Sequence, residues 1–180
     1  MSARYDVTTH LFDKTAAYFI DANVWLYVFG PMPPSDWRSR VYSNAWKRLL
    51  TSGANVFIDV LVASEIMNRW ARIEYARLGG DVKFGSFKDF RSTPDFRSVA
   101  SDITATLRSI LKYAKRTGTP FANVNLEATL NDFAAGTMDF VDSLICESCR
   151  AKPFILITHD GDMKVDGVDV VTGNKRLLGS

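Results

Sequence analysis

The stretch AYFIDANVWLYVFG, residues 17–30, places a single carboxylate inside an apolar run. Asp21 directly follows residues 16–20, whose apolar and aromatic side chains predict a buried strand. An ionised carboxylate in apolar surroundings is costly unless a partner compensates its charge. The position of Asp21 therefore indicates a functional site at the carboxyl end of a buried strand.

Strand-like and helical segments alternate along the rest of the chain. A helix is expected to begin at the N-cap Ser35 and to end at Gly53, and residues 81–101 are expected to form a loop. Further helices are predicted at 62–80, 102–118, 127–136 and 137–153, and further strands at 55–61, 154–158 and 168–172. This alternation predicts an α/β fold with a mainly parallel central sheet covered by helices, whose ligands bind at the strands' carboxyl ends.

Composition narrows the class of protein. The 180 residues are 47% hydrophobic and 23% charged, which fits one globular domain over residues 1–180. No apolar run approaches the roughly 18 residues of a membrane span, and the N-terminus is too polar for a signal peptide. Two cysteines make no disulfide framework, which is typical of a reducing compartment. Together these features predict a cytoplasmic protein without a membrane partner. Phosphate-binding glycine motifs are absent, and two histidines do not support a zinc cluster.

Charge is distributed unevenly along the chain. Residues 69–116 hold eleven Lys and Arg against five Asp and Glu, a net charge of +6. Residues 125–170 hold three against nine, a net charge of −6. This asymmetry predicts a basic surface beside an acidic centre, although two solvated faces would give the same pattern.

Three further acids occupy positions from which they could reach the same strand ends as Asp21. Asp160 follows the strand at 154–158, Glu65 lies in the first turns of the helix after 55–61, and Asp142 opens the apolar part of its helix. Converging carboxylates repel one another and raise their pKa values unless a cation holds them. Oxygen-only ligands favour Mg²⁺ or Mn²⁺.

Four motifs carry a family resemblance. In chain order they are YFIDANVWLY, VASEIMNR, VDSLICESC and ILITHDGDM, and together they resemble the PIN domain of metal-dependent ribonucleases and VapC-type toxins. The resemblance extends from about residue 18 to residue 172. It implies a three-layer α/β/α domain that hydrolyses RNA with Mg²⁺ or Mn²⁺, leaving a 5′-phosphate and a 3′-hydroxyl. It also allows the role of toxin in a type II toxin-antitoxin pair, with an antitoxin protein and a homodimer as partners.

The resemblance assigns roles to individual residues. The catalytic acids are Asp21, Glu65, Asp142 and Asp160. Asp21, Asp142 and Asp160 would hold the metal, with Asp162 as an auxiliary acid and Asp139 able to share the role of Asp142. Asn23 and Thr158 match polar positions of the motifs. The sequence departs from the family at Ala22, where Thr or Ser is frequent, and at Met163, where an aromatic residue is common.

The segment at about 80–118 is expected to be a basic, Phe-rich helical or loop insertion that binds RNA. Lys83, Lys88 and Arg91 would contact phosphates. Four aromatic rings interleave with them and could stack on bases: Phe84, Phe87, Phe90 and Phe96. In the alternative interpretation, these rings tuck into the fold or join a dimer interface, as Trp25 and Tyr27 could also do.

Each acid also has an ordinary structural explanation. Asp21 could cap the turn after its strand, and Glu65 could pair with Arg69. Asp142 could be a solvated helix residue, and Asp160 and Asp162 could form an ordinary Asp-Gly turn with Gly161. At the level of function, the alternatives are a non-catalytic RNA-binding PIN module and a Mg²⁺-dependent phosphatase of the haloacid-dehalogenase type. The phosphatase requires a second Asp where this chain has Asn23.

Overall fold

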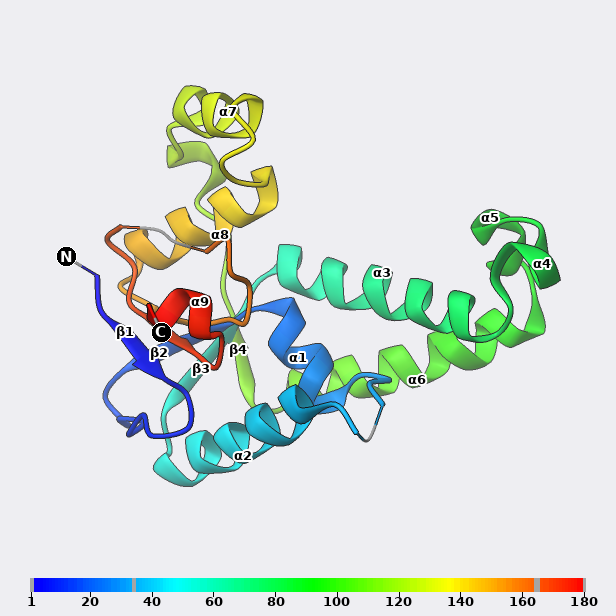
Figure 1. The fold of residues 1–180 in the computed structure, drawn as a ribbon, viewed down its shortest axis with the longest axis horizontal. Coiled ribbons are helices and arrows are strands. Elements are labelled where there is room, and N and C mark those ends of the chain that lie inside the picture. The colour runs from blue at the N-terminus through cyan, green and yellow to red at the C-terminus, as the bar shows by residue number, and fades with distance from the viewer. Residues whose placement is uncertain (1, 34, 164–165, 180) are drawn as a thin grey trace.

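The computed structural model describes residues 2–33, 35–163 and 166–179. In these ranges the strands form one six-stranded, all-parallel sheet in the order β1-β6-β5-β2-β3-β4 (Figure 1). The strands are β1 (Arg4–Asp6), β2 (Ala17–Ile20), β3 (Asn55–Ile58), β4 (Ala114–Arg116), β5 (Ile155–Ile157) and β6 (Val170–Thr172). The predicted α/β fold with a parallel sheet is confirmed.

Helices connect the strands and cover both faces of the sheet. They are α1 (Ala22–Phe29), α2 (Trp37–Ser52), α3 (Val60–Arg77), α4 (Gly80–Phe84), α5 (Phe87–Phe90), α6 (Pro94–Ile110), α7 (Leu126–Ala134), α8 (Phe140–Ala151) and α9 (Lys175–Leu178), with a 3₁₀ turn η1 at Phe121–Asn123. Figure 1 shows α2 on one side of the sheet and α8 on the other. No helix in the described residues is long and apolar enough to cross a membrane.

The central strands of the sheet are continuously apolar because both of their faces are buried. Ile20 of β2 and Ile157 of β5 lie side by side in register and face the helices α1 and α2. On the opposite face, the Phe154 ring stacks on Phe19 at 5.9 Å and on Phe57 at 4.7 Å between ring centroids. Strands buried on both faces lose the alternation of polar and apolar residues that marks half-exposed strands.

The same register brings distant residues to one edge of the sheet. The chain leaves β2 at Asp21 and leaves β5 at Thr158, directly after the paired residues Ile20 and Ile157. The connections on the two sides of this strand pair run in opposite directions, since β3 lies beyond β2 and β6 lies beyond β5. Such a point in an open parallel sheet is where ligand sites form.

Several predicted boundaries are wrong. The strand predicted at 55–61 ends at Ile58, because the Asp59 side chain accepts a hydrogen bond from the Val62 amide at 3.0 Å and caps α3. The N-cap of α2 is Asp36 and not Ser35, since the Asp36 carboxylate accepts from the Arg38 amide at 2.9 Å. Helix α1 and the edge strand β1 were not predicted.

The segment after α3 differs most from the prediction. The expected loop at 81–101 contains α4, α5 and the first turns of α6, with Thr93 as N-cap and Pro94 at the first helical position. The helix expected at 102–118 ends at Ile110, and residues 114–116 form β4. Pairing of Val56 with Ala114 across the sheet overrides the helical propensity of this short segment.

Helices α3 and α6 pack along each other and project from the sheet as an arm, with α4 and α5 at its tip (Figure 1). Phe90 is fully buried at this tip. Its ring lies 5.4 Å from Tyr75, 4.8 Å from Phe84 and 5.4 Å from Phe96. The expectation that these Phe rings form a base-stacking surface is therefore wrong for Phe90. The alternative, in which the rings tuck into the fold, describes the tip.

Candidate functional site

Asp21 is a buried carboxylate held by its neighbours' side chains. The residue is only 3% exposed and stands at the N-cap position of α1, yet within the described residues its side chain makes no capping hydrogen bond. Instead the Thr158 hydroxyl donates to Asp21 Oδ2 at 2.6 Å, and the Asn23 side-chain amide donates to the same oxygen. The capping explanation for Asp21 is thus not the one that the structure shows.

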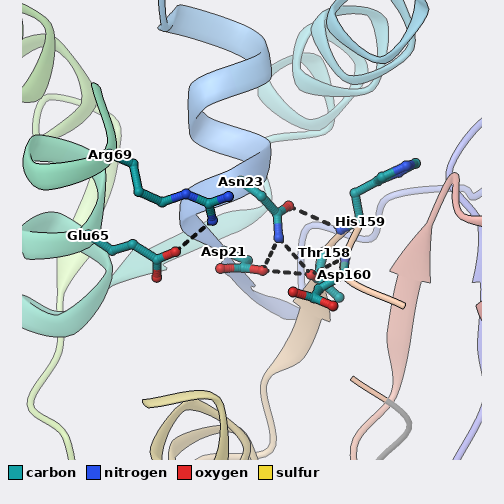
Figure 2. Close-up of polar contacts among 7 residues, drawn as sticks. All are labelled: Asp21, Asn23, Glu65, Arg69, Thr158, His159 and Asp160. Atoms are coloured by element: carbon teal, nitrogen blue, oxygen red, sulfur yellow. Dashed lines mark hydrogen bonds and ion pairs between the residues drawn. The ribbon is translucent and has the colours of Figure 1, made fainter. Parts of the chain in front are cut away.

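Thr158 and Asn23 tie the two strand ends together. Thr158 Oγ1 accepts from the Asn23 amide at 3.2 Å and from the Asp160 backbone N–H at 3.0 Å. The His159 backbone N–H donates to Asn23 Oδ1 at 3.1 Å (Figure 2). Both side chains are buried, so they orient Asp21 and the Asp160 backbone rather than face solvent.

Burial raises the pKa of Asp21 to about 6, and the charges of Glu65 and Asp160 add to the rise, whereas the Thr158 hydrogen bond opposes it. Figure 2 shows the Asp21 carboxylate between those of Glu65 and Asp160. The four acids that the sequence singled out thus come from separate segments to one region. In the folded chain, the charges of the neighbouring acids disfavour ionisation of Asp21 and Asp142.

A pocket of about 510 Å³ opens over this region. Its lining combines acids from three segments with polar residues of α3 and two apolar side chains: Leu61, Ser64, Glu65, Asn68, Arg69, Asp139, Val141, Asp142 and Asp160. Asp142 is partly buried there in the first turn of α8. Burial, followed by the charges of Asp21, Asp160, Asp139 and Glu65, raises the pKa of Asp142 to about 7.

Glu65 carries the ion pair that the sequence analysis gave as its alternative. Arg69 Nη1 lies 2.7 Å from Glu65 Oε1, one helical turn further along α3 (Figure 2). The pair does not remove Glu65 from the site, because both side chains line the pocket. Arg69 therefore places a cation among the carboxylates, and the sequence analysis had not given it a functional role.

The auxiliary acids separate into two groups. Asp139 lines the pocket but is also the N-cap of α8, since its Oδ1 accepts from the Val141 amide at 2.9 Å. Asp162 is exposed, lies 3.3 Å from Arg176 in an ion pair, and lines a different pocket. The fold therefore places Asp139, and not Asp162, beside Asp142.

Asp59 shows why an acid after a strand is weak evidence alone. It follows β3 as Asp21 follows β2, and it is equally buried. Its carboxylate, however, caps α3 and accepts from the Thr119 hydroxyl at 2.8 Å, so both oxygens are committed to structure.

The donor chemistry of the site suits a hard divalent cation. Its acidic side chains offer only oxygen atoms as ligands, and burial together with the neighbouring carboxylate charges raises the pKa values of Asp21 and Asp142. In the described ranges, no three His, Cys, Asp or Glu side chains are arranged so that they could hold a metal ion as they stand. The residues fit Mg²⁺ or Mn²⁺ by type, and binding would require their carboxylates to come closer together.

The basic residues predicted to bind RNA lie at the far end of the arm. Helix α3 has 18 residues, so its ends are about 27 Å apart, and Glu65 is near one end while α4 follows the other. Lys83 pairs with Asp95 at 2.7 Å, and the Arg91 guanidinium lies 6.0 Å from the centre of the Phe96 ring. Lys88 is exposed on α5. These cations do not line the acidic pocket.

The two cysteines and Trp25 are also buried. Cys146 and Cys149 lie inside α8 as buried free thiols. Trp25 is only 1% exposed and belongs to the core, so it is not an interface residue of the described structure.

The fold that carries this site is a PIN-like α/β fold. A solved structure with a similar fold is described as VapBC2 from Rickettsia felis bound to a DNA fragment from their promoter. The two chains are 14% identical with a TM-score of 0.56, over 87% of this chain and 98% of that chain. Neither a protein-family model nor a curated protein matches the sequence. At this identity, the likeness concerns the fold.

Proposed function

We propose that the protein is a metal-dependent endoribonuclease that uses Mg²⁺ or Mn²⁺. The observation that carries the proposal is the meeting of four acids in one region, Asp21, Glu65, Asp142 and Asp160, where burial and then the neighbouring carboxylate charges raise the pKa values of Asp21 and Asp142. Ionised carboxylates this close together destabilise the fold unless a bound cation compensates their charge. The PIN-like fold supports the same proposal.

The chain's own residues divide the work of hydrolysis. Asp21, fixed by Thr158 and Asn23, would hold the cation together with Asp142 and Asp160. When bound, a divalent cation offsets the charge of the phosphodiester and activates water for attack. Glu65 would orient that water.

Arg69 complements this arrangement. Its guanidinium lies in the same pocket as the acids and would meet a phosphate oxygen of the substrate, which a carboxylate cluster alone would repel.

Cleavage of structured and unstructured RNAs, with Mg²⁺, Mn²⁺ or EDTA, tests the proposal. Wild type should cleave only with metal and leave 5′-phosphate ends, and Asp142→Asn should lose at least a hundredfold in rate, about 3 kcal/mol of activation free energy. Glu127→Gln is the matched control, because Glu127 is an exposed acid on the neighbouring helix α7 and is outside the pocket. Equal rates for wild type and Asp142→Asn would refute the assignment.

We also propose that the chain is the toxin of a type II toxin-antitoxin pair, with an antitoxin and a second copy of itself as partners. The described VapBC2 structure has a similar fold and supports this role by analogy. Induced expression of wild type in growing bacteria should arrest growth, and expression of Asp142→Asn to the same level should not. Arrest by both proteins would show that the effect does not depend on the acidic site.

A second candidate is an RNA-binding module without catalysis. The observation that favours it is that the described carboxylates are not arranged as a ready-made metal site. Calorimetric titration with Mn²⁺ separates the two candidates. A nuclease should bind the ion at a site that Asp142→Asn weakens, and a binding module should show no such site. The phosphatase alternative requires a second Asp at position 23, and this chain has Asn there. The Asn23 side-chain amide donates a hydrogen bond to Asp21.

A further inference from the structure

A group of aromatic side chains, Trp37, Tyr27, Tyr42 and His159, adjoins the acidic site next to Asp160. The His159 backbone N–H is bonded to Asn23, but Figure 2 shows its ring directed away from the carboxylates. The ring packs edge-on against Trp37 at 5.5 Å and Tyr27 at 5.7 Å between centroids. Asp160 is the next residue in the chain, so this cluster begins where the acidic site ends.

The buried Tyr42 holds the aromatic cluster in place. Tyr42 is 1% exposed, and its hydroxyl lies 2.9 Å from His159 Nδ1 and donates to the Thr158 carbonyl at 3.2 Å. Tyr27 stacks on Tyr42 with an interplanar angle of 14°. Tyr42 thereby fixes the Tyr27 and His159 rings relative to Thr158 at the end of β5.

Trp37 is the exposed member of the group. It is the first residue of α2, and half of its surface is accessible to solvent. The other tryptophans, Trp25, Trp46 and Trp70, are at most 9% exposed. A large aromatic ring that keeps half of its surface open next to a polar site can serve as a stacking platform.

Positive charge accompanies this platform. The Arg38 guanidinium lies 4.8 Å from the centre of the Tyr27 ring, and Asp36 holds it through contacts of 3.0 and 2.7 Å. A guanidinium over the half-buried Tyr27 ring, next in sequence to the exposed Trp37, suits a ligand that has both a flat aromatic part and a phosphate.

We propose that Trp37, with Tyr27 and His159, forms a subsite that stacks an unpaired nucleobase of RNA adjacent to the phosphodiester at the acidic pocket. This inference rests on the proposed ribonuclease function and names the substrate as single-stranded at that position. It also replaces the Phe-rich segment as the source of base stacking, since Phe90 and its neighbours fill the arm tip. Stacking on aromatic rings is tolerant of sequence, so the subsite selects an unpaired base rather than a particular one.

Intrinsic fluorescence tests the proposal because Trp37 is the accessible tryptophan. Short single-stranded RNA is titrated in Ca²⁺ without Mg²⁺ or Mn²⁺, and compared with oligonucleotides that carry one abasic position placed in turn along the strand. Intact RNA should quench the tryptophan fluorescence of wild type. The oligonucleotide whose abasic position falls at the subsite should not quench it. Quenching that no abasic position changes would overturn the proposal.

Affinity measurements with variants give a second readout. Trp37→Ala should weaken binding of intact RNA about tenfold, should leave binding of the matching abasic RNA unchanged, and should be rescued largely by Trp37→Phe. Tyr113→Ala is the matched control, because Tyr113 is 55% exposed and also packs edge-on against one ring, Trp46, at 5.9 Å. Equal loss in both alanine variants, or none in Trp37→Ala, would overturn the proposal.

Failure of the subsite and failure of the proposed function have different signatures. Metal-dependent cleavage with no role for Trp37 refutes the subsite alone. Base-dependent quenching without any cleavage refutes the nuclease and leaves the subsite in place. Urea unfolding of each variant confirms that it is folded, and the abasic series requires no variant.

Discussion

Replacing Asp142 with Asn should stabilise the metal-free protein at high pH. The pKa of Asp142 rises from 3.8 to about 7, chiefly through burial and then through the charges of Asp21 and Asp160. A group whose pKa is higher in the folded state stabilises that state while it is protonated, and this stabilisation is lost as pH rises through the folded-state pKa. Above pH 7 the ionised carboxylate therefore weakens the fold, and a neutral Asn does not.

The size of the effect follows from the shift. A rise in pKa from 3.8 to about 7 corresponds to about 4 kcal/mol if the environment is fully shielded from solvent. Asp142 lines an open pocket and is partly exposed, so solvent screening reduces the expected gain to about 1–2 kcal/mol at pH 8. At pH 5 the folded-state carboxyl is protonated and the gain should fall to about a third of that value.

Urea unfolding with EDTA at pH 5, 6, 7 and 8 measures this prediction on wild type, Asp142→Asn and Glu127→Gln. The difference between wild type and Asp142→Asn should grow steadily with pH, and Glu127→Gln should follow wild type. Mn²⁺ should then stabilise wild type at pH 8 more than Asp142→Asn. A pH-independent difference, or a destabilised Asp142→Asn at pH 8, would show that Asp142 is not under electrostatic strain.

Three further outcomes are expected. Thr158→Val removes the hydroxyl that donates to Asp21, so unfolding in urea should show a loss of about 1–3 kcal/mol, which Thr158→Ser should largely restore. Phe90→Ala empties the fully buried centre of the arm tip and should cost about 3–5 kcal/mol, while Mn²⁺ binding measured by calorimetry stays unchanged. RNA binding should weaken, and its dependence on salt should flatten, when three arm-tip cations are neutralised together: Lys83, Lys88 and Arg91.

The central part of the fold could be predicted because its signal is strong in the sequence. Strands β2 and β5 are apolar on both faces and are each followed by polar residues, so their assignment placed Asp21 and Asp160 correctly at strand ends. The order of four acids along the chain then indicated a common site. For Asp21 and Asp160 this inference rested on parallel strands ending at the same edge of a sheet, and for Glu65 and Asp142 it rested on their helix positions and on the family resemblance.

The arm was mispredicted because its Phe residues alternate with charges. Such a pattern is typical of an exposed loop, whereas the structure turns Phe84, Phe87 and Phe90 toward Tyr75. Strand β4 was missed because its three residues include Lys115 and Arg116, and only pairing with β3 fixes their conformation. Long-range contacts of this kind leave no periodic signal in a short segment.

The role of Trp37 and His159 also depends on contacts that no local pattern reveals. They are 122 positions apart in the sequence, and although His159 lies within the ILITHDGDM motif, the resemblance gave neither residue a role. Their rings meet because α2 packs over the strand end that carries His159. Only the exposure of Trp37 in the folded chain distinguishes it from the three buried tryptophans.

The hydrogen bond from Thr158 to Asp21 joins residues that are 137 positions apart. During synthesis, the first acid leaves the ribosome long before its partner strand exists, and β2 then lacks the neighbour that completes its edge. A growing polypeptide, or one cut by a protease before residue 158, therefore cannot assemble the centre. The hydrogen-bonded setting of Asp21 therefore forms only after residue 158 has been synthesised.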